Sequence, residues 1–400
     1  MQSWKIKILI GFAAGILLFG FAVCPAQAAF TSLYIFGDTV SSTTDSPGGS
    51  DYYGNRYSNG RVWVEVLAQQ LGLTNNYWYS TNSSNPLSYT NLSASSTNWS
   101  YSSNNNSYYD HNSALLVPEV NSFSAPTNAT NALFIVWVND ADFVDILNQT
   151  TPILISPPYT TAQLPQWTNV FNLSLTNHFQ VITNLYAKGA RTLIMPNAVD
   201  LTKVPGYAYY LNSSNALFFR QRVMAFNAAF ANTLNSAKAS CPGLTIYVPD
   251  FFALLDNVVS NSANYGLTNA LDANGLSIGA REDPALTNKA LNGPGTNYIF
   301  WDYEDPSAKF HAVLADVAQQ LISPARITNF TVLTGSNRLD VASLPIGLNG
   351  FVDGSTNLVL ANWVAQTNFN STNATQSIFV PASGPVWFYR LRFPFAWSWP

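Results

Sequence analysis

Charge is scarce in this sequence. Only 10% of its 400 residues are charged, whereas 47% are hydrophobic, and Asn, Ser and Thr supply the remaining polarity. Such a balance is typical of a folded protein with a large core. With 17 basic residues against 21 acidic ones, the chain carries a net charge of −4, which argues against nucleic acid as a partner.

Cysteine is nearly absent as well. The two cysteines are Cys24, close to the N-terminus, and Cys241. If the N-terminal segment is removed, the single remaining thiol excludes an internal disulfide framework and a thiolate metal site. We expect Cys241 to be a small buried residue.

The N-terminus has the pattern of an export signal. Lys5 and Lys7 precede an apolar run at 8–23, and the small residues Ala26 and Ala28 mark a cleavage point after Ala28. We therefore expect a signal peptide at residues 1–28, a mature net charge of about −6 and a secreted, periplasmic or cell-surface location. A membrane anchor is the alternative, but the run is shorter than the ~20 residues that a bilayer requires. No later run is long enough to span a membrane, so we expect none in the mature chain.

Apolar strands alternate with helical patterns over most of the chain. Buried strands are predicted at 33–36, 132–138, 192–195, 244–248 and 298–301. Helical patterns are found at 62–71, 179–187, 217–234 and 308–321. This alternation predicts an α/β fold with a flavodoxin-like parallel sheet in a three-layer α/β/α arrangement. Ligands of such sheets bind beyond the carboxyl ends of the strands, and we expect the chemistry there.

Two segments depart from this pattern. Residues 77–112 are rich in Ser, Asn, Thr and Tyr, and we expect long surface loops around one weak strand. After Pro324 the chain turns to short alternating segments separated by Gly, Asn and Pro, which predict a small all-β domain. We therefore expect an α/β/α domain at 29–325 and a β-sandwich-like accessory domain at 326–400.

Three passages carry a family resemblance. They are Phe36-Gly37-Asp38-Thr39, Gly54-Asn55-Arg56-Tyr57-Ser58-Asn59-Gly60-Arg61-Val62-Trp63, and Ile299-Phe300-Trp301-Asp302-Tyr303-Glu304-Asp305-Pro306-Ser307. In order and spacing the chain resembles the GDSL (SGNH) esterase and acylhydrolase family over about residues 31–323. The resemblance implies an SGNH-hydrolase fold and hydrolysis of acyl esters. It also implies a Ser nucleophile, an oxyanion hole made by a Gly and an Asn, and an Asp-x-x-His pair.

The family's reacting groups are substituted in this chain. Thr39 stands at the nucleophile position, where its extra methyl group would hinder attack, and a hydrogen bond to the local backbone is the competing role. Asp302 aligns with the orienting carboxylate, and Asp305 stands where the family has its catalytic His. An Asp is a useful base near neutral pH when burial or a second carboxylate raises its pKa. His311 lies six residues further on a predicted helix and should face elsewhere.

The oxyanion blocks are also altered. If the third block is aligned to the family pattern without a gap, Ala141 takes the Asn position and Asn139 takes the Gly position. An alignment shifted by two residues would instead bring Asn139 and Asp140 into the site. Ser95 stands in the second block, and its backbone N–H is a candidate donor. We expect the cleft to be formed by Asp38, Ser95, Asn139 and Asp142. Of the other histidines, His178 opens a predicted helix and His111 could swing toward the site.

Several functions remain open on the sequence alone. The carboxylates expected at the strand ends could bind Ca²⁺ or Mg²⁺, but their spacing matches no metal-binding loop, so we expect neither a metal nor a cofactor. The chain is interpreted as a monomeric secreted esterase, or alternatively as an inactive homologue that binds a glycan or small ligand or serves at the cell surface. The C-terminal part resembles β-modules of exported bacterial proteins. Its aromatic residues Trp363 and Trp387 serve either core packing or sugar binding.

Overall fold

The computed structural model describes most of the chain. It covers residues 30–41, 50–54, 56–71, 113–125, 127–148, 155–208, 213–345, 347–357, 363–382 and 388–393, with Trp397 and Trp399. The expected signal peptide and the segment 77–112 with its weak strand lie outside these residues. Across the described ranges, no helix combines the length and the apolar character needed to cross a membrane.

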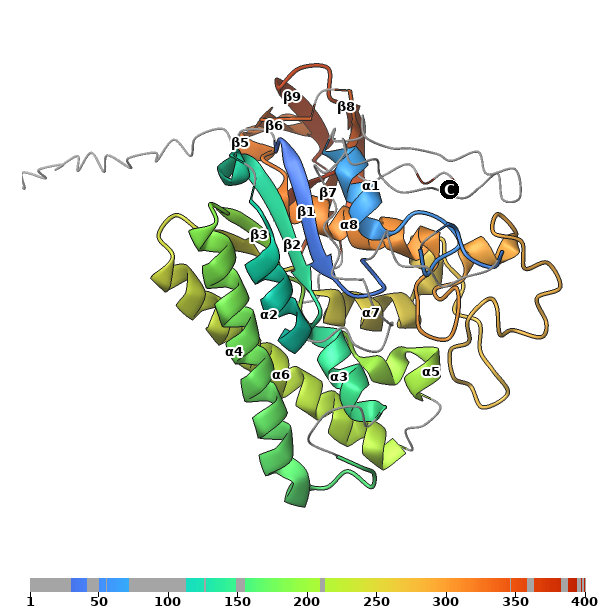
Figure 1. Ribbon diagram of the computed structural model, residues 1–400. Coiled ribbons are helices and arrows are strands. Elements are labelled where there is room, and N and C mark those ends of the chain that lie inside the picture. Colours follow the sequence, from blue (N-terminus) through green and yellow to red (C-terminus); the bar gives the residue numbers. More distant parts are fainter. Residues whose placement is uncertain are drawn as a thin grey trace, which may run out of the picture.

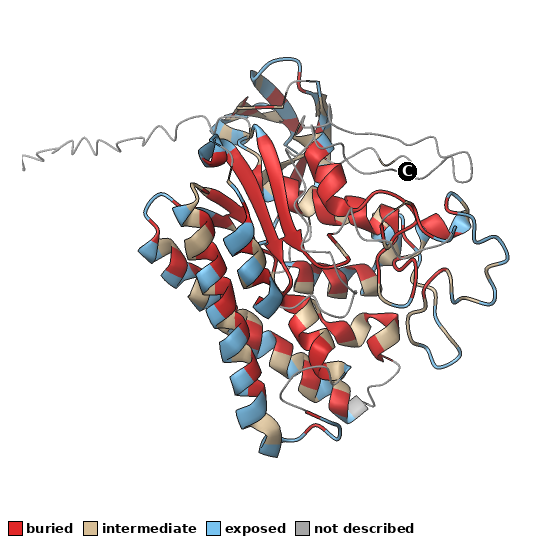
Figure 2. Cartoon of the chain, viewed as in Figure 1, coloured by how far each residue is buried: buried red, intermediate tan, exposed pale blue. Residues whose placement is uncertain are grey.

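A four-stranded parallel sheet forms the centre of the first domain (Figure 1). Its strands, in spatial order, are β1 (Ser32–Gly37), β2 (Ala132–Trp137), β3 (Thr192–Ile194) and β4 (Thr245–Tyr247). Every residue of β1 and β2 is buried (Figure 2), as expected for strands covered on both faces. The predicted parallel α/β architecture is therefore confirmed.

Helices pack in two groups around this sheet. One group is α2 (Ser113–Ser122), α4 (Leu164–Ala187) and α6 (Ser213–Ser240), and the other is α1 (Trp63–Gln70) and α8 (Ala308–Ile322). Shorter helices follow the carboxyl ends of strands or their loops: α3 (Asn139–Leu147), α5 (Pro205–Ala208) and α7 (Phe251–Ser260). The 3₁₀ turns are η3 (Ala129–Asn131), η4 (Thr161–Gln163), η5 (Leu201–Lys203), η6 (Ser262–Tyr265) and η7 (Pro294–Asn297).

The helix predicted at 179–187 is the second half of α4. This helix starts at Leu164 with a proline in its first turn and stops before Gly189, whose φ of 102° lies in the left-handed region. Helices α2, α3, α5 and α7 were not predicted.

The prediction of a strand at 298–301 is wrong. The backbone groups of this stretch form hydrogen bonds with separate loops. Ile299 N–H donates to Thr268 O at 3.1 Å, and Ala280 N–H donates to Phe300 O at 3.1 Å. Trp301 N–H donates to Asp305 O at 2.8 Å, which closes a tight loop at 301–305. This stretch therefore forms isolated bridges rather than a fifth strand.

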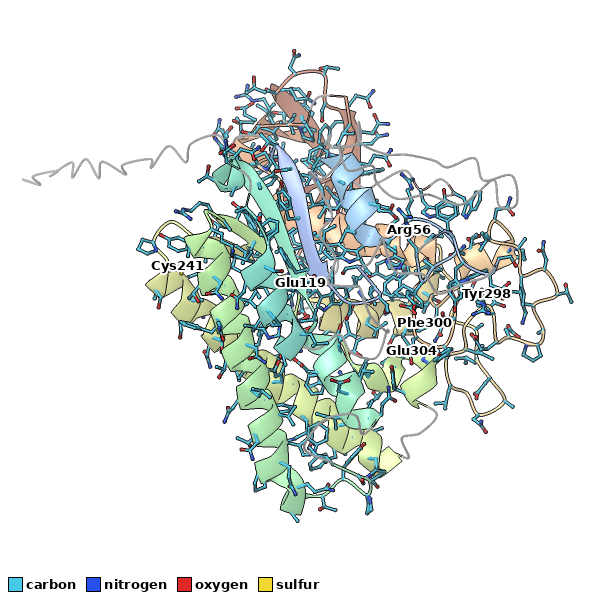
Figure 3. The ribbon with its side chains drawn as sticks, viewed as in Figure 1. Arg56, Glu119, Cys241, Tyr298, Phe300 and Glu304 are labelled. Carbon is cyan, nitrogen blue, oxygen red and sulfur yellow. The ribbon has the colours of Figure 1, made fainter. Side chains whose placement is uncertain are left out.

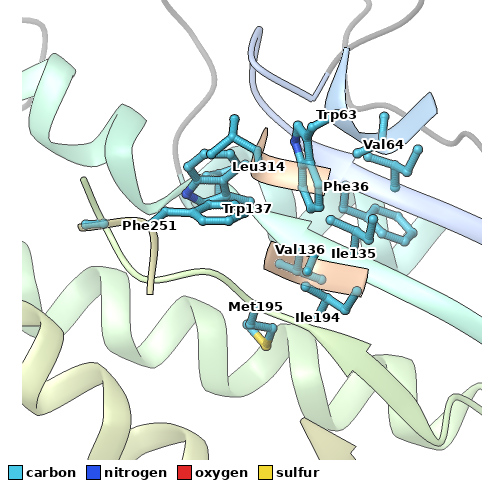
Figure 4. Packing of buried hydrophobic residues seen from close by; sticks show 14 of the residues in the cluster. Phe36, Trp63, Val64, Ile135, Val136, Trp137, Ile194, Met195, Phe251 and Leu314 are labelled. Atoms are coloured by element: carbon cyan, nitrogen blue, oxygen red, sulfur yellow. The ribbon is translucent and has the colours of Figure 1, made fainter. Parts of the chain in front are cut away.

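Aromatic side chains fill the core beneath the carboxyl ends of the strands (Figure 4). The rings of Trp63, Trp137 and Phe251 meet pairwise, with centroids 5.0 to 5.9 Å apart and tilted or edge-to-face geometry. This packing gives the strand ends a rigid apolar support.

The C-terminal part is a separate antiparallel all-β region. One sheet contains β5 (Arg326–Leu333), β6 (Ser336–Ala342) and β9 (Thr375–Pro381), and the other contains β7 (Asn349–Ser355), β8 (Val364–Asn370) and β10 (Phe388–Arg392). Their shared core includes Leu339, Val352 and Ile378. The chain then returns to the first domain, where Trp399 Nε1–H donates to Asn59 O at 2.9 Å.

Candidate active site

Thr39 lies in a turn directly after β1. The turn is fixed by two hydrogen bonds of Asp38, whose N–H donates to Trp137 O at 3.3 Å and whose Oδ1 accepts Val40 N–H at 3.1 Å. A side chain at Gly37 would bring its Cβ within 2.7 Å of the Ser41 Cβ, so the turn requires glycine there. Asp38 and Thr39 are therefore held at the strand end.

The loop at 301–305 supplies the second half of the site. Asp302 Oδ1 accepts the N–H groups of Glu304 at 2.8 Å and Asp305 at 2.7 Å. These two bonds fix the course of the loop and the direction of the Asp305 side chain. Thr39 Oγ1–H donates to Asp305 Oδ1 at 3.0 Å, which joins the two halves of the site.

The carboxyl groups of this site are buried together. Burial, with the nearby charges of Asp302 and Glu304, raises the pKa of Asp305 well above its usual value. Burial also raises the pKa of Asp302, and it raises the pKa of Asp38 to about 7 and that of Glu304 to about 8. Asp305 therefore gains basicity that a solvated aspartate lacks.

A cavity adjoins the Thr39 hydroxyl. It opens to solvent and lies at the carboxyl ends of β1 and β2. Its polar lining is Asp38, Thr39, Asp140, Glu304 and Asp305, and its apolar lining includes Val144, Leu201, Phe251, Phe300 and Leu314. Phe300 and Glu304, both labelled in Figure 3, belong to this lining. A second, more polar cavity shares Tyr207 and Glu304 with the first.

The third sequence block presents Ala141 to the cavity. Asn139 points elsewhere, because its Nδ2–H donates to Pro196 O at 2.9 Å. Asp142 also faces away from Thr39, since its Oδ1 accepts Ser113 N–H at 3.0 Å and its Oδ2 accepts the Ser174 hydroxyl. These two residues, expected in the cleft, instead tie α3 to its neighbours.

The passage at 54–63 fastens the 301–305 loop to α1. Ser58 Oγ–H donates to Pro306 O at 3.0 Å. The Asn59 side chain donates to Leu291 O at 2.8 Å and accepts Ala308 N–H at 2.9 Å. The motif therefore has a structural role, since it positions the loop that carries Asp305.

Two residues of the site had no sequence signal. Tyr52 OH donates to Asp302 Oδ2 at 2.7 Å, and Arg281 Nη1–H donates to the Tyr52 hydroxyl at 2.5 Å. Tyr52 precedes the 54–63 passage by two positions, whereas Arg281 belongs to a loop without periodicity. Neither sequence position marks its residue as part of a functional site.

The described histidines do not serve Thr39. His311 is fully buried, and its Nδ1 accepts Trp63 N–H at 3.2 Å, as its helical offset from Asp305 suggested. His178 lies within α4, where its Nδ1 lies 2.8 Å from Ser174 O. Burial lowers the pKa of His311 to about 3 and that of His178 to about 4. His111 and Ser95 lie outside the described residues.

The carboxylates expected at the strand ends gather in part. Asp38, Asp140, Glu304 and Asp305 line the cavity, with Asp302 behind them. Among the residues that the structure describes, no three His, Cys, Asp or Glu side chains are arranged to hold a metal ion.

Comparison with known proteins gives a consistent family. The model of GDSL-like Lipase/Acylhydrolase matches residues 33–318. GDSL esterase/lipase At1g73610 of Arabidopsis thaliana is 22% identical over 322 residues, which cover 72% of this chain and 88% of that protein. GDSL esterase/lipase At5g03810 of the same plant is 28% identical over 149 residues, or 36% of this chain, and the match spans 42% of the relative's length.

The solved structures are more distant. A crystal structure of an extracellular lipase from Streptomyces rimosus has a TM-score of 0.34 and 12% identity, covering 72% of this chain and 99% of that one.

Proposed function

This chain belongs to the GDSL-like lipase/acylhydrolase family, and from that membership we propose that it hydrolyses carboxylic esters with Thr39 as nucleophile and Asp305 as base. The observation that carries the proposal is the 3.0 Å hydrogen bond from Thr39 Oγ1–H to Asp305 Oδ1 beside an open cavity. A hydroxyl nucleophile needs an adjacent proton acceptor, and the raised pKa of Asp305 fits that task.

The reaction proceeds by acyl transfer. The Asp305 carboxylate takes the Thr39 proton while Oγ1 attacks the ester carbonyl carbon, and the alcohol leaves with that proton. Water, deprotonated by Asp305, then releases the acid from the acyl-threonine and restores the hydroxyl. The apolar lining suits the acyl chain, and the second cavity, with Asp272, Ser277 and Glu282 in its lining, suits a polar alcohol portion.

Hydrolysis of p-nitrophenyl esters by purified variants tests this function. Thr39→Ala should abolish turnover, Thr39→Ser should retain or increase it because the hindering methyl group is lost, and Asp305→Asn should lower kcat by about 10²- to 10⁴-fold. Thr31→Ala is the matched control, since it removes an exposed hydroxyl near the opposite end of β1. Equal turnover by Thr39→Ala and the unaltered chain would exclude the nucleophile.

A second candidate function is ligand binding without catalysis. It is favoured by Ala141, which lines the cavity and which the ungapped alignment places at the family's oxyanion-hole Asn. Trp137 lines the same cavity, so a fatty acid or glycan that enters it should change tryptophan fluorescence. Saturable binding without turnover of any ester would support this function against hydrolysis.

We also propose that the chain acts outside the cytoplasm as a monomer on a small ester or glycan. Lys5, Lys7 and the apolar run at 8–23 support export. N-terminal sequencing of the exported chain should begin at Ala29, and light scattering should give the mass of one chain. An unprocessed N-terminus would contradict export, and a dimer mass would contradict the monomeric state.

A further inference from the structure

The two carboxyl groups of the 301–305 loop have unequal surroundings. Asp302 accepts three hydrogen bonds, from Tyr52 OH at 2.7 Å and from the backbone N–H groups of Glu304 and Asp305 at 2.8 and 2.7 Å. An ionised carboxylate is a pure acceptor, so this set of donors favours the charged form of Asp302.

Asp305 has the opposite environment. The hydrogen bond that reaches its side chain comes from Thr39, and the charged groups that act on it are the carboxylates of Asp302, Glu304 and Asp38. These negative charges disfavour ionisation of Asp305. When the two carboxyl groups together hold one proton, that proton is therefore more stable on Asp305 than on Asp302.

Tyr52, which donates to Asp302, is itself held in place by Arg281. Its hydroxyl accepts from Arg281 Nη1–H at 2.5 Å, and the Arg281 guanidinium lies 4.6 Å from the centre of the Tyr52 ring. Arg281 is in turn paired with Asp51 at 2.8 Å. These contacts orient the Tyr52 hydroxyl as a donor toward Asp302.

We propose that Tyr52, held by Arg281, is a positioning residue that keeps negative charge on Asp302 and thereby makes Asp305 the carboxyl group that stays protonated to higher pH. The proposal concerns where the proton resides, and its kinetic consequence rests on the proposed base role of Asp305. The catalytic carboxylate would then become available only as the pH rises.

The other charged groups near the pair act in known directions. Arg281 stabilises the charge of Asp302, whereas Glu282 and Asp302 repel one another. Glu304 and Asp38 disfavour charge on Asp305. Tyr52→Phe leaves the charges of these groups in place, while Arg281 loses the Tyr52 hydroxyl as an acceptor and keeps its ion pair with Asp51.

Removal of the Tyr52 hydroxyl should redistribute the proton. Without this donor the Asp302 anion is less stable, so the proton spends more time on Asp302 and Asp305 ionises at lower pH. One charge-assisted hydrogen bond corresponds to about one pH unit. We therefore expect the titration midpoint of Asp305 to fall by about one pH unit in Tyr52→Phe and that of Asp302 to rise.

The pH titration is followed by NMR on the full chain with ¹³C-labelled aspartate carboxyl groups. Asp302→Asn and Asp305→Asn identify the two resonances by their loss. Tyr298→Phe is the matched control: Tyr298 belongs to the same aromatic cluster as Tyr52 and donates to the carboxylate of Asp283 at 2.8 Å. Arg281→Gln, which loosens the Tyr52 hydroxyl, is the second variant if Tyr52→Phe does not fold.

Each outcome is decisive. A downward shift of Asp305 in Tyr52→Phe but not in Tyr298→Phe supports the proposal. An unchanged Asp305 midpoint, or equal shifts in both variants, overturns it. If the unaltered chain hydrolyses esters, the rise of kcat/KM with pH should move down by the same amount, with KM nearly unchanged. An NMR shift in a chain without esterase activity would leave the positioning role standing while the proposed hydrolysis fails.

Discussion

Arg56 and Glu65 form an ion pair in the interior of the protein, and breaking it should be costly. Their side chains are 2% and 0% exposed, and Arg56 Nη2 lies 2.5 Å from Glu65 Oε1. Glu65 Oε2 also accepts Val62 N–H at 2.9 Å at the start of α1. Because solvent does not reach the pair, Arg56→Met leaves a buried carboxylate with little compensation. We expect a loss of about 3–5 kcal/mol in the free energy of unfolding.

A double-mutant cycle separates the pair from its surroundings. Glu65→Gln keeps an acceptor for Val62 N–H but removes the charge, so by itself it leaves Arg56 without its counterion. The double variant Arg56→Met/Glu65→Gln removes both charges and should be more stable than Arg56→Met alone. Urea unfolding followed by tryptophan fluorescence gives the four free energies. A cost below about 1 kcal/mol for Arg56→Met, or strictly additive losses, would refute this reasoning.

Two further predictions concern the cavity. Ala141→Asn should restore an amide donor and raise kcat for ester hydrolysis by at least about tenfold, as steady-state kinetics would show; an equal rate would mean that the amide does not reach the oxyanion. Burial raises the pKa of Asp38 from 3.8 to about 7, so its stabilising contribution is full below pH 3.8 and is lost as the pH rises to about 7. Asp38→Asn should remove about 4 kcal/mol of this pH dependence from urea unfolding profiles, and an unaltered profile would contradict it.

Much of the scaffold was predictable because its signals are local. The apolar runs of β1 and β2 are continuous, and buried parallel strands require that pattern. The run at 298–301 looks the same in sequence, but its backbone groups bond to three separate loops. Strand formation depends on the partner, which a local pattern does not contain.

The site was predictable where strand ends and family motifs supply the residues. Thr39 and Asp305 meet as the aligned blocks suggested. Asp142 was expected beside them, yet it lies two residues after Asp140 on α3, about 200° around the helix, and so faces the opposite side. A helix predicted from Asn139 would have shown this. The pairing of Tyr52 with Arg281 spans distant loops, and no spacing rule connects them.

Trp399, which follows the last strand of the β-region, packs beside the loops of the candidate site. Its indole packs edge-on against Tyr53, with centroids 5.8 Å apart, in the cluster that also contains Tyr52 and Trp301. Removal of Trp399 would therefore take away a contact of Tyr53, the neighbour of the tyrosine that donates to Asp302. A residue beyond the last strand thus adds packing beside the loop that positions Asp302.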